Sequence, residues 1–259
     1  MYISVIIPTH NPGDYLWQCL DSFVHQTISP TYFEVIIILN GSKDPYYDEI
    51  NKYILKHSEI NFILIYTDKK GVSNARNIGI DRAKGEYISF VDDDDYVSTC
   101  YLEELLQNAD VDTISLSNTL AFYVDKEWIP NQNITNDYCF SGKEISFYKA
   151  RRFFNGPVYK LIHKNIIGNR RYDLTFKNGE DSLFMFLISD RFKKVVFTSP
   201  SAIYYRRLRP NSASQVKRHS ISKIMNGVRL VFQYIKIYLK GFPHYNLYFL
   251  LTRIIGTLR

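Results

Sequence analysis

The chain has 259 residues, of which 46% are hydrophobic and 22% are charged, and it carries a formal net charge of +6. This length and composition allow one large domain with an appendage, or two small domains, and they exclude an intrinsically disordered chain. Three widely spaced cysteines, the lack of a signal peptide and apolar runs too short to cross a bilayer together predict a cytoplasmic protein.

The first half of the chain alternates strand and helix patterns. Strands are expected where β-branched and aromatic residues gather, at 2–7, 33–39, 62–66 and 87–91. Amphipathic stretches between them predict one helix that begins at Asn11 and two more over 46–57 and 73–83. We expect Asn11 to cap the first helix, with Pro12 at its first position. Such alternation predicts an α/β fold with a mostly parallel sheet.

Polar clusters follow three of these strands, at Thr9-His10-Asn11, at Asn40-Gly41-Ser42 and at the four aspartates 92–95. Ligands bind at the carboxyl ends of parallel strands, so we expect the clusters to share one edge of the sheet. Adjacent carboxylates disfavour each other's ionisation and need a cation nearby. Since side chains alternate along an extended chain, Asp92 and Asp94 can hold one divalent cation together. Taken alone, the cluster also fits a solvated acidic turn before a helix.

The segment 71–79 combines a glycine turn, a serine suited to capping a helix and Arg76 within that helix. A guanidinium can donate two charge-assisted hydrogen bonds to phosphate. An isolated arginine of this kind is more often a surface ion-pair partner. Beside the aspartates 92–95, however, Arg76 could balance their charge and hold a diphosphate.

The second half of the chain is less regular. A strand is expected over 113–120, and the stretch to about residue 155 shows no clear pattern. Asn178 or Asp181 is expected to cap a helix through 183–188, and acids at this position favour the helix dipole. From Tyr204 to Arg259 there are eleven Lys and Arg and no Asp or Glu, which leaves 21 basic and 26 acidic residues, a charge of −5, for residues 1–203.

Apolar residues at helical spacing predict two helices in this basic tail, over 221–239 and 245–251. Two interpretations stay open. Both helices could pack on the preceding domain, with their cations in solvent. Alternatively, they could form an interfacial segment that holds the chain against an anionic membrane surface.

Several motifs occur together in one order. They are SVIIPTHN at 4–11, Asn40-Gly41-Ser42 with Asp44, the segment 71–79, Phe90-Val91-Asp92 with Asp94 and Asp95, Lys160-Leu161, Gly179-Glu180-Asp181 with Phe184, and Tyr205-Arg206 followed by Ser212 and Ser214. With these motifs the chain resembles a family 2 glycosyltransferase of the GT-A fold over about residues 3–215. The resemblance implies a Rossmann-like, mostly parallel sheet flanked by helices. It also implies a catalytic domain over 1–215, with a nucleotide-sugar-binding half (1–110) and an acceptor-binding half (111–215), followed by a basic helical tail over 216–259.

The resemblance further implies an inverting transferase that moves a sugar from a nucleoside diphosphate, most often UDP, to a hydroxyl of a glycan or lipid-linked acceptor in surface-polysaccharide synthesis. By position, Asp181 would be the general base, and Asp94 and Asp92 would hold Mn²⁺ or Mg²⁺. The donor would contact Pro8, Thr9, His10, Asn40, Arg76, Asp92 and Asp93. The acceptor would contact Glu180, Lys160 and Arg206, whereas Arg207 and Arg209 would face the diphosphate or the acceptor.

Other functions fit these residues less well. A nucleic-acid-binding protein would explain the basic tail but not the acidic strand end, because phosphate backbones need cations. A catalytically degenerate sugar-nucleotide-binding or scaffolding protein of the same fold is the alternative, and intact Asp94 and Asp181 count against it. If the tail binds lipid, the protein is expected on the inner face of the plasma membrane.

The chain departs from the family pattern at the end of the second strand. The family usually has an acidic pair there, in which an aspartate accepts a hydrogen bond from the nucleobase, and this chain has Leu39-Asn40. A leucine cannot accept a hydrogen bond, and an amide offers both a donor and an acceptor. The motif therefore leaves the identity of the base open.

Overall fold

The computed structural model describes residues 2–123, 129–130, 143–209 and 220–258. The first half alternates strands and helices as predicted: β1 (Ile3–Thr9), α1 (Tyr15–Val24), the 3-10 turn η1 (Pro30–Tyr32), β2 (Phe33–Asn40), α2 (Tyr46–Lys56), β3 (Phe62–Thr67), α3 (Val72–Arg82) and β4 (Tyr87–Phe90). The second half contains shorter elements: β5 (Tyr96–Val97), α4 (Tyr101–Gln107), β6 (Thr113–Leu116), β7 (Asn118–Tyr123), β8 (Ile129–Pro130), α5 (Phe147–Ala150), the 3-10 turn η3 (Arg151–Phe153), β9 (Lys160–His163), α6 (Lys164–Ile167), α7 (Glu180–Leu187), β10 (Lys194–Phe197) and β11 (Ile203–Leu208). Two long helices follow, α8 (Ser220–Lys240) and α9 (Leu247–Leu258).

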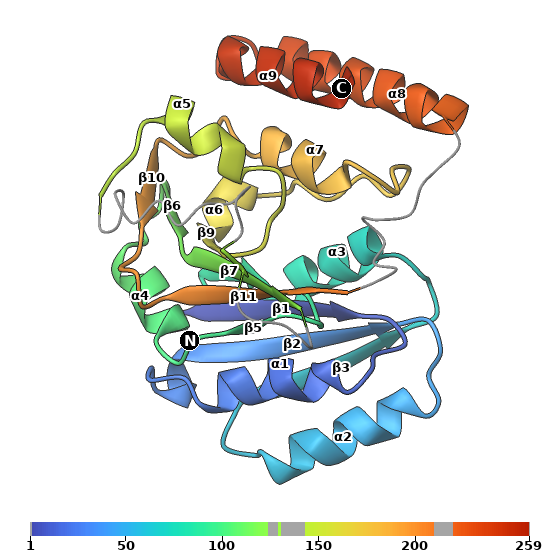
Figure 1. The fold of residues 1–259 in the computed structure, drawn as a ribbon, viewed down its shortest axis with the longest axis vertical. Coiled ribbons are helices and arrows are strands. Elements are labelled where there is room, and N and C mark those ends of the chain that lie inside the picture. The colour runs from blue at the N-terminus through green and yellow to red at the C-terminus, as the bar shows by residue number, and fades with distance from the viewer. Residues whose placement is uncertain (1, 124–128, 131–142, 210–219, 259) are drawn as a thin grey trace.

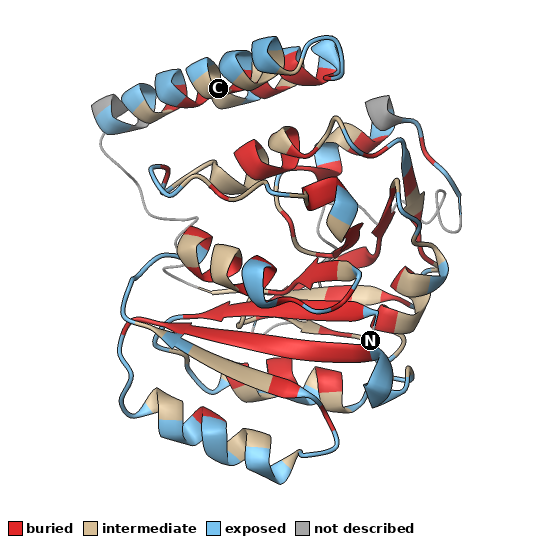
Figure 2. Ribbon diagram, turned by 180° about the vertical axis from the view of Figure 1, so that it is seen from behind, coloured by how far each residue is buried: buried red, intermediate tan, exposed pale blue. Residues whose placement is uncertain are grey.

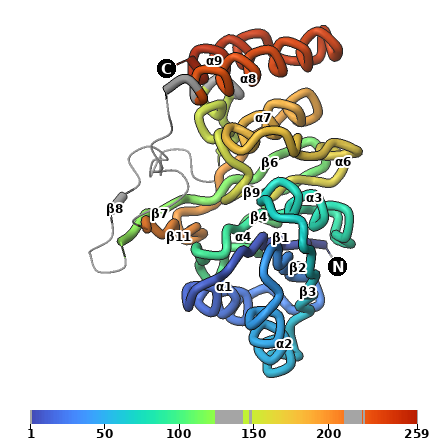
Figure 3. The backbone as a smooth tube through the Cα atoms, turned by 90° about the vertical axis from the view of Figure 1, so that its right-hand side faces the viewer, coloured from blue at the N-terminus to red at the C-terminus, as the bar shows by residue number. Residues whose placement is uncertain are grey.

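Seven strands form the main sheet, in the order β10-β6-β9-β4-β1-β2-β3. β1 runs parallel to β2 and β4, β2 to β3, and β6 to β10, whereas β9 is antiparallel to both of its neighbours. All residues of β1 and β2 are buried, because helices cover both faces of the sheet. Figures 1 and 3 show α1 and α3 on opposite sides of these strands. The predicted mostly parallel α/β fold is confirmed.

A second sheet was not predicted. The single strand expected over 113–120 is two strands, which separate at Ser117, and β6 stays in the main sheet while β7 leaves it. β7 joins β5, β11 and β8 in the order β5-β11-β7-β8. Because β5 directly follows the aspartates 92–95 and pairs with β11, the end of β11 lies against the acidic segment.

Two predicted helix caps were wrong. The first helix begins at Tyr15, with Asp14 as its N-cap, and Asn11 lies before it at φ 48°. Asparagine tolerates this left-handed conformation, which the turn after β1 requires. The N-cap of α7 is Gly179, at φ 76°, so Asp181 lies inside the first turn of the helix and neither Asn178 nor Asp181 caps it. Glycine is favoured at this position because it adopts the left-handed conformation without steric cost.

Close packing of α3 on the sheet positions one arginine of the predicted site. The side of α3 that meets the sheet carries small residues, and a Cβ on Gly79 would lie 2.4 Å from Cγ2 of Ile6 in β1. Ala75, one turn earlier, is fully buried. This close approach brings Arg76 of the same helix within reach of Asp92, just after β4.

The two predicted tail helices are present and pack on each other and on α7, at one end of the molecule (Figure 1). The Tyr234 and Ser182 hydroxyls are hydrogen bonded at 2.7 Å, and the Tyr245 hydroxyl donates to the Leu187 carbonyl at 2.8 Å. In Figure 2 the buried residues of this hairpin face the body of the molecule and its exposed residues face away. Within the described parts of the chain, no helix combines the length and apolarity that crossing a membrane requires.

Candidate functional site

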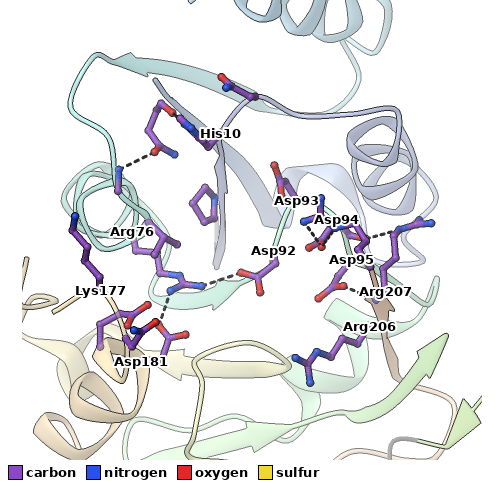
Figure 4. Close-up of a pocket in the computed structure, with 18 of the residues that line it drawn as sticks. His10, Arg76, Asp92, Asp93, Asp94, Asp95, Lys177, Asp181, Arg206 and Arg207 are labelled. Carbon is purple, nitrogen blue, oxygen red and sulfur yellow. Dashed lines mark hydrogen bonds and ion pairs between the residues drawn. The ribbon is translucent and has the colours of Figure 1, made fainter. Parts of the chain in front are cut away.

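A pocket of about 930 Å³ lies where β1, β2 and β4 end (Figure 4). Segments far apart in the sequence line it: Pro8, His10, Asn11 and Tyr15; Asn40; Lys70, Gly71, Val72 and Arg76; Asp92, Asp93, Asp94 and Asp95; Asn155; Lys177, Asn178, Gly179, Glu180 and Asp181; and Arg206, Arg207, Leu208 and Arg209. The volume suits a small-molecule ligand of nucleotide-sugar size. The polar clusters that follow β1, β2 and β4 therefore reach one pocket, as the parallel-sheet argument predicted.

Arg76 connects two walls of this pocket. Its Nη2 lies 2.9 Å from Oδ1 of Asp92, and its Nη1 lies 2.6 Å from Oδ1 of Asp181. Only 4% of the Arg76 side chain is exposed, and its guanidinium lies 5.6 Å from the ring centre of Tyr172. Burial acts to lower the pKa of Arg76, but Asp181 and Asp92 raise it above the ordinary value, so the guanidinium stays charged. One cation thus joins carboxylates 89 positions apart in the chain.

The four aspartates are not equivalent. Asp95 is buried, and its carboxylate accepts hydrogen bonds from the Tyr204 hydroxyl and the Arg207 backbone N–H, both at 2.7 Å. Burial, with Asp94 and Asp92 nearby, raises the pKa of Asp95 well above its usual range. Asp95 therefore ties the acidic segment to β11, and it has few free lone pairs for a ligand.

Asp93 and Asp94 line the pocket, and their carboxyl groups also have raised pKa values. The Thr9 hydroxyl donates to Asp93 at 2.5 Å, and burial together with Asp94 and Asp92 raises the pKa of Asp93 to about 7. Arg209 lies 2.6 Å from Oδ2 of Asp94 through both Nε and Nη2. Burial and Asp92 still raise the pKa of Asp94, although Arg209 acts to lower it. The segment as a whole favours an added cation.

The donor set fits a hard divalent cation that is completed by ligand oxygens. Among the described residues, no group of three His, Cys, Asp or Glu is arranged to hold a metal ion. Magnesium-type sites, however, often use one or two carboxylates, with phosphate oxygens and waters filling the other positions. Asp92 and Asp94 offer such carboxylates in a pocket that Arg76 also lines, so these two residues would hold the metal.

Asn40 and His10 form the other end of the pocket. The Asn40 side-chain amide donates to the Thr9 carbonyl at 2.8 Å, and its oxygen accepts from the Gly71 backbone N–H at 3.1 Å. His10 Nδ1 is hydrogen bonded to the Asn40 carbonyl. Asn40 therefore links the ends of β1 and β2 to the turn before α3, while Leu39 beside it is a core residue.

Asp181 lies in the first turn of α7, directly after Glu180, and its side chain faces Arg76 (Figure 4). Burial raises the pKa of Asp181 to about 6, although Arg76 acts to lower it. A carboxyl group with such a pKa is ionised at neutral pH and can accept a proton from a bound hydroxyl. Its first-turn position also places it at the positive end of the α7 dipole.

The remaining predicted residues lie in different places. Arg206 lines the pocket together with Glu180. Lys160 does not belong to the described lining; it is fully buried, and its ammonium donates to the carbonyls of Gly156 and Val158 at 2.9 and 3.1 Å. Burial lowers the pKa of Lys160 well below its usual value. Ser212 and Ser214 lie outside the described residues.

Sequence reasoning missed several lining residues. Lys70 precedes the glycine turn of 71–79, and Lys177 precedes Gly179-Glu180-Asp181, so proximity to a motif was the available signal for both. Asn155 lies in the irregular stretch and had no such signal. Tyr204 was also missed: its hydroxyl accepts from the Asp92 backbone N–H at 3.2 Å and donates to Asp95, so it holds the acidic turn from β11.

Comparison with known proteins gives one family. Residues 4–174 match the model of glycosyl transferase family 2. Among curated proteins, the chain is 27% identical over 225 residues to the uncharacterized glycosyltransferase EpsJ of Bacillus subtilis. This match covers 83% of the present chain and 63% of EpsJ. The chain thus spans less than two thirds of that relative's length.

Solved structures share the fold. Staphylococcus aureus TarS residues 1–349 in complex with UDP-GlcNAc superpose with a TM-score of 0.75 at 21% identity, covering 91% of this chain and 67% of that one. The mannosyltransferase PcManGT from Pyrobaculum calidifontis, in complex with GDP-Man and Mn²⁺, gives a TM-score of 0.67 at 15% identity, covering 98% of this chain and 68% of that one. Both likenesses establish the GT-A architecture of this chain.

Proposed function

The chain belongs to glycosyl transferase family 2, and from this premise we propose that it is an inverting glycosyltransferase. It transfers a sugar from a nucleoside diphosphate donor, for which we propose UDP, to a hydroxyl of a glycan or lipid-linked acceptor. The observation that carries the proposal is the Arg76 bridge between Asp92 and Asp181 across one pocket. On this proposal, a diphosphate-binding wall and a carboxylate that can take a proton would lie in the same pocket, joined by Arg76.

The donor diphosphate is assigned to the wall formed by Arg76 and the aspartates after β4. Arg76 is buried and charged, so its attraction for phosphate oxygens is little screened by water. Asp92 and Asp94 would hold a divalent metal at the same wall, and such a metal supplies Lewis-acid stabilisation of charge on the departing diphosphate. The Mn²⁺ complex of the structurally similar mannosyltransferase supports this assignment.

The nucleoside is assigned to the Pro8–His10 end of the pocket. We choose UDP as the first nucleotide to test because TarS, which has a similar fold, is known in complex with UDP-GlcNAc. The side-chain amide of Asn40 is already hydrogen bonded to two backbone groups. A nucleobase would therefore have to displace one of these groups to bind the amide, or else bind the adjacent backbone. Recognition of the base in this chain would therefore differ from recognition by an aspartate.

The proposed reaction is a single displacement. The acceptor hydroxyl oxygen forms a bond with the anomeric carbon on the face opposite the leaving group, and the bond from that carbon to the diphosphate oxygen breaks. Asp181 takes the hydroxyl proton, and the diphosphate leaves with the bonding electrons. Glu180, which precedes Asp181 in the chain, and Arg206 also line the pocket and are assigned to the acceptor.

Donor binding can be tested by thermal shift with UDP, GDP and their sugar derivatives, with and without Mn²⁺. A ligand that binds only the native state raises its stability, by about 2.7 kcal/mol at a hundredfold excess over Kd. We expect one nucleotide class to raise the melting temperature, and Mn²⁺ to increase the rise. No rise with any of these donors would contradict the proposed donor site.

Two substitutions then separate the roles. Asp94→Ala is expected to remove the Mn²⁺-dependent part of the thermal shift and of turnover. Asp181→Asn is expected to keep donor binding and to lose sugar transfer by a factor of at least about 100, the usual size of general-base catalysis. Transfer by Asp181→Asn at the wild-type rate would refute the base assignment. Donor binding without turnover in the wild-type protein would instead favour a sugar-nucleotide-binding scaffold.

A further inference from the structure

The outer face of the C-terminal hairpin is unusually apolar. Of the twenty large hydrophobic side chains that are exposed among the described residues, twelve lie within 224–258, with exposed fractions from 36 to 68%. On α8 the exposed residues are Ile224, Met225, Val228, Phe232, Ile235 and Leu239. From Met225 onward they recur every three or four residues, and Ile224 lies four residues before Val228, so all six lie on one stripe of the helix. We call this stripe, with its counterpart on α9, the hairpin face.

α9 continues the hairpin face. Leu247, Leu251, Ile255 and Leu258 are between 48 and 65% exposed, again at helical spacing. The residues that hold the hairpin to the domain lie on the opposite side: Tyr234 and Phe249 are fully buried against α7 and its neighbours. Packing on the domain therefore does not explain the exposed stripe, and exposed apolar surface of this extent marks an interaction site.

The charge of the segment identifies the partner. Residues 220–258, which form the hairpin, contain five Lys and Arg and no acidic residue, and of the five only Arg253 is buried among the residues whose burial the structure describes. Arg229, Lys236 and Lys240 are exposed and lie on the helical flank next to the apolar stripe of α8. A second copy of the chain would bring the same positive charges together, whereas an anionic surface would complement them.

We infer that the hairpin face docks on the surface of an anionic phospholipid bilayer. α8 and α9 would lie along the surface, with Phe232, Leu239 and their neighbours in the interfacial region and the lysines among the headgroups. Apolar side chains and flanking cations on one helix are the pattern of helices that lie in this plane. The inference concerns a surface outside the pocket and does not depend on the reaction performed there.

The hairpin also touches the wall of the pocket. Asn226 Nδ2 of α8 donates to the Asn178 carbonyl at 3.2 Å, and Arg253 Nη1 of α9 donates to Oδ1 of Asn155 at 2.5 Å. Both Asn155 and Asn178 line the pocket. Docking would hold this wall close to the bilayer, and on the proposed function it would favour acceptors carried on a lipid.

Vesicle flotation tests the inference directly. The full chain is mixed with phosphatidylcholine vesicles, either pure or with about 30 mol% phosphatidylglycerol, at low and high salt. We expect binding to the anionic vesicles that weakens at high salt, and little binding to the neutral ones. Lys236→Gln with Lys240→Gln should weaken binding by about fivefold for each lost cation.

Matched variants separate the apolar contribution from folding. Phe232→Ser with Leu239→Ser removes two side chains that are 68 and 67% exposed, and should lower vesicle binding by at least about tenfold. Leu55→Ser on α2, where the leucine is 72% exposed, is the control and should bind as the wild type does. Unchanged circular dichroism and melting temperature would show that all variants fold.

Two results would overturn the inference. One is wild-type protein that does not float with anionic vesicles, or that floats equally well after Phe232→Ser with Leu239→Ser. The other is a concentration-dependent dimer in sedimentation that the same double substitution disperses, since the hairpin face would then be covered by a second copy.

Discussion

Replacing Asp181 with asparagine is expected to stabilise the fold at pH 8, even though it removes one half of a 2.6 Å ion pair. Burial raises the pKa of Asp181 from 3.8 to about 6 despite the neighbouring Arg76. At about 1.4 kcal/mol per pKa unit this corresponds to about 3 kcal/mol of destabilisation for the ionised carboxylate. Because 29% of the side chain is exposed to screening solvent, we expect about 2 kcal/mol.

The sign of the effect depends on pH. Below about pH 3 the carboxyl is protonated in the folded and the unfolded chain, so it makes no pH-dependent contribution to the free energy of unfolding there. The wild type loses stability relative to Asp181→Asn as the pH rises from about 4 to 6, and the difference stays constant above that window. Urea unfolding at pH 8 should therefore show the asparagine variant more stable by about 2 kcal/mol, and unfolding at pH 4 should reduce this difference to about 0.5 kcal/mol or less.

Asp190 provides a matched control. It forms two 2.6 Å hydrogen bonds with Arg170, away from the acidic pocket, so Asp190→Asn should lower stability by about 1–3 kcal/mol at pH 8. The reasoning is refuted if Asp181→Asn is less stable than the wild type at pH 8, or if its gain in the free energy of unfolding is the same at pH 8 and pH 4. The first result would mean that the Arg76 pair outweighs the burial of Asp181, and the second that the gain does not come from the ionisation of this carboxyl.

Three further outcomes are expected. Turnover should rise with pH through about 6 and level off above it, because Asp181 must be ionised to accept a proton, and a profile that is flat between pH 5 and 8 would contradict its role. Asn40→Asp should cost about 1–3 kcal/mol in urea unfolding, since it replaces the donor to the Thr9 carbonyl with a second acceptor, and wild-type stability would show that this bond contributes little. Gly79→Ala should cost about 1–3 kcal/mol because its Cβ would meet a β1 side chain at 2.4 Å, whereas Gly256→Ala, with nothing within 4 Å, should be neutral or stabilising; similar values for both would contradict the close packing of α3.

The sequence predicted the first half of the fold well, because its strands are continuous apolar runs and each is separated by a helix of ordinary length. The sequence also predicted that the polar clusters after these strands lie together, since parallel strands bring their carboxyl ends to one edge of the sheet. That reasoning was enough to gather the aspartates 92–95, Asn40 and His10 into one pocket.

The second half was harder for physical reasons. The chain changes sheet at Ser117 without a glycine or proline to mark the break, so the pattern indicated one strand where there are two. Pairing of β5 with β11 joins segments about a hundred positions apart, and no local pattern reports it. The cap at Asn11 was wrong because asparagine serves helix caps and left-handed turns equally well, and only the path of the chain decides between them.

Asn40 illustrates a limit of a different kind. The sequence shows an amide where an aspartate is usual, but it cannot show that both polar atoms of the amide bond to the backbone. The substitution therefore has a structural consequence, which joins three segments, in addition to any effect on the base.

The double attachment of Arg76 bears on the timing of the proposed reaction. When Asp181 takes a proton from the acceptor, its charge disappears and Arg76 loses one of its two counter-ions. The guanidinium remains charged, since its pKa lies above the ordinary range, and its attraction for negative charge at the diphosphate wall becomes stronger. Proton uptake on one side of the pocket would thus coincide with stabilisation of the leaving group on the other. Loss of that proton to solvent would return Arg76 to its resting pair and reset the site for the next donor.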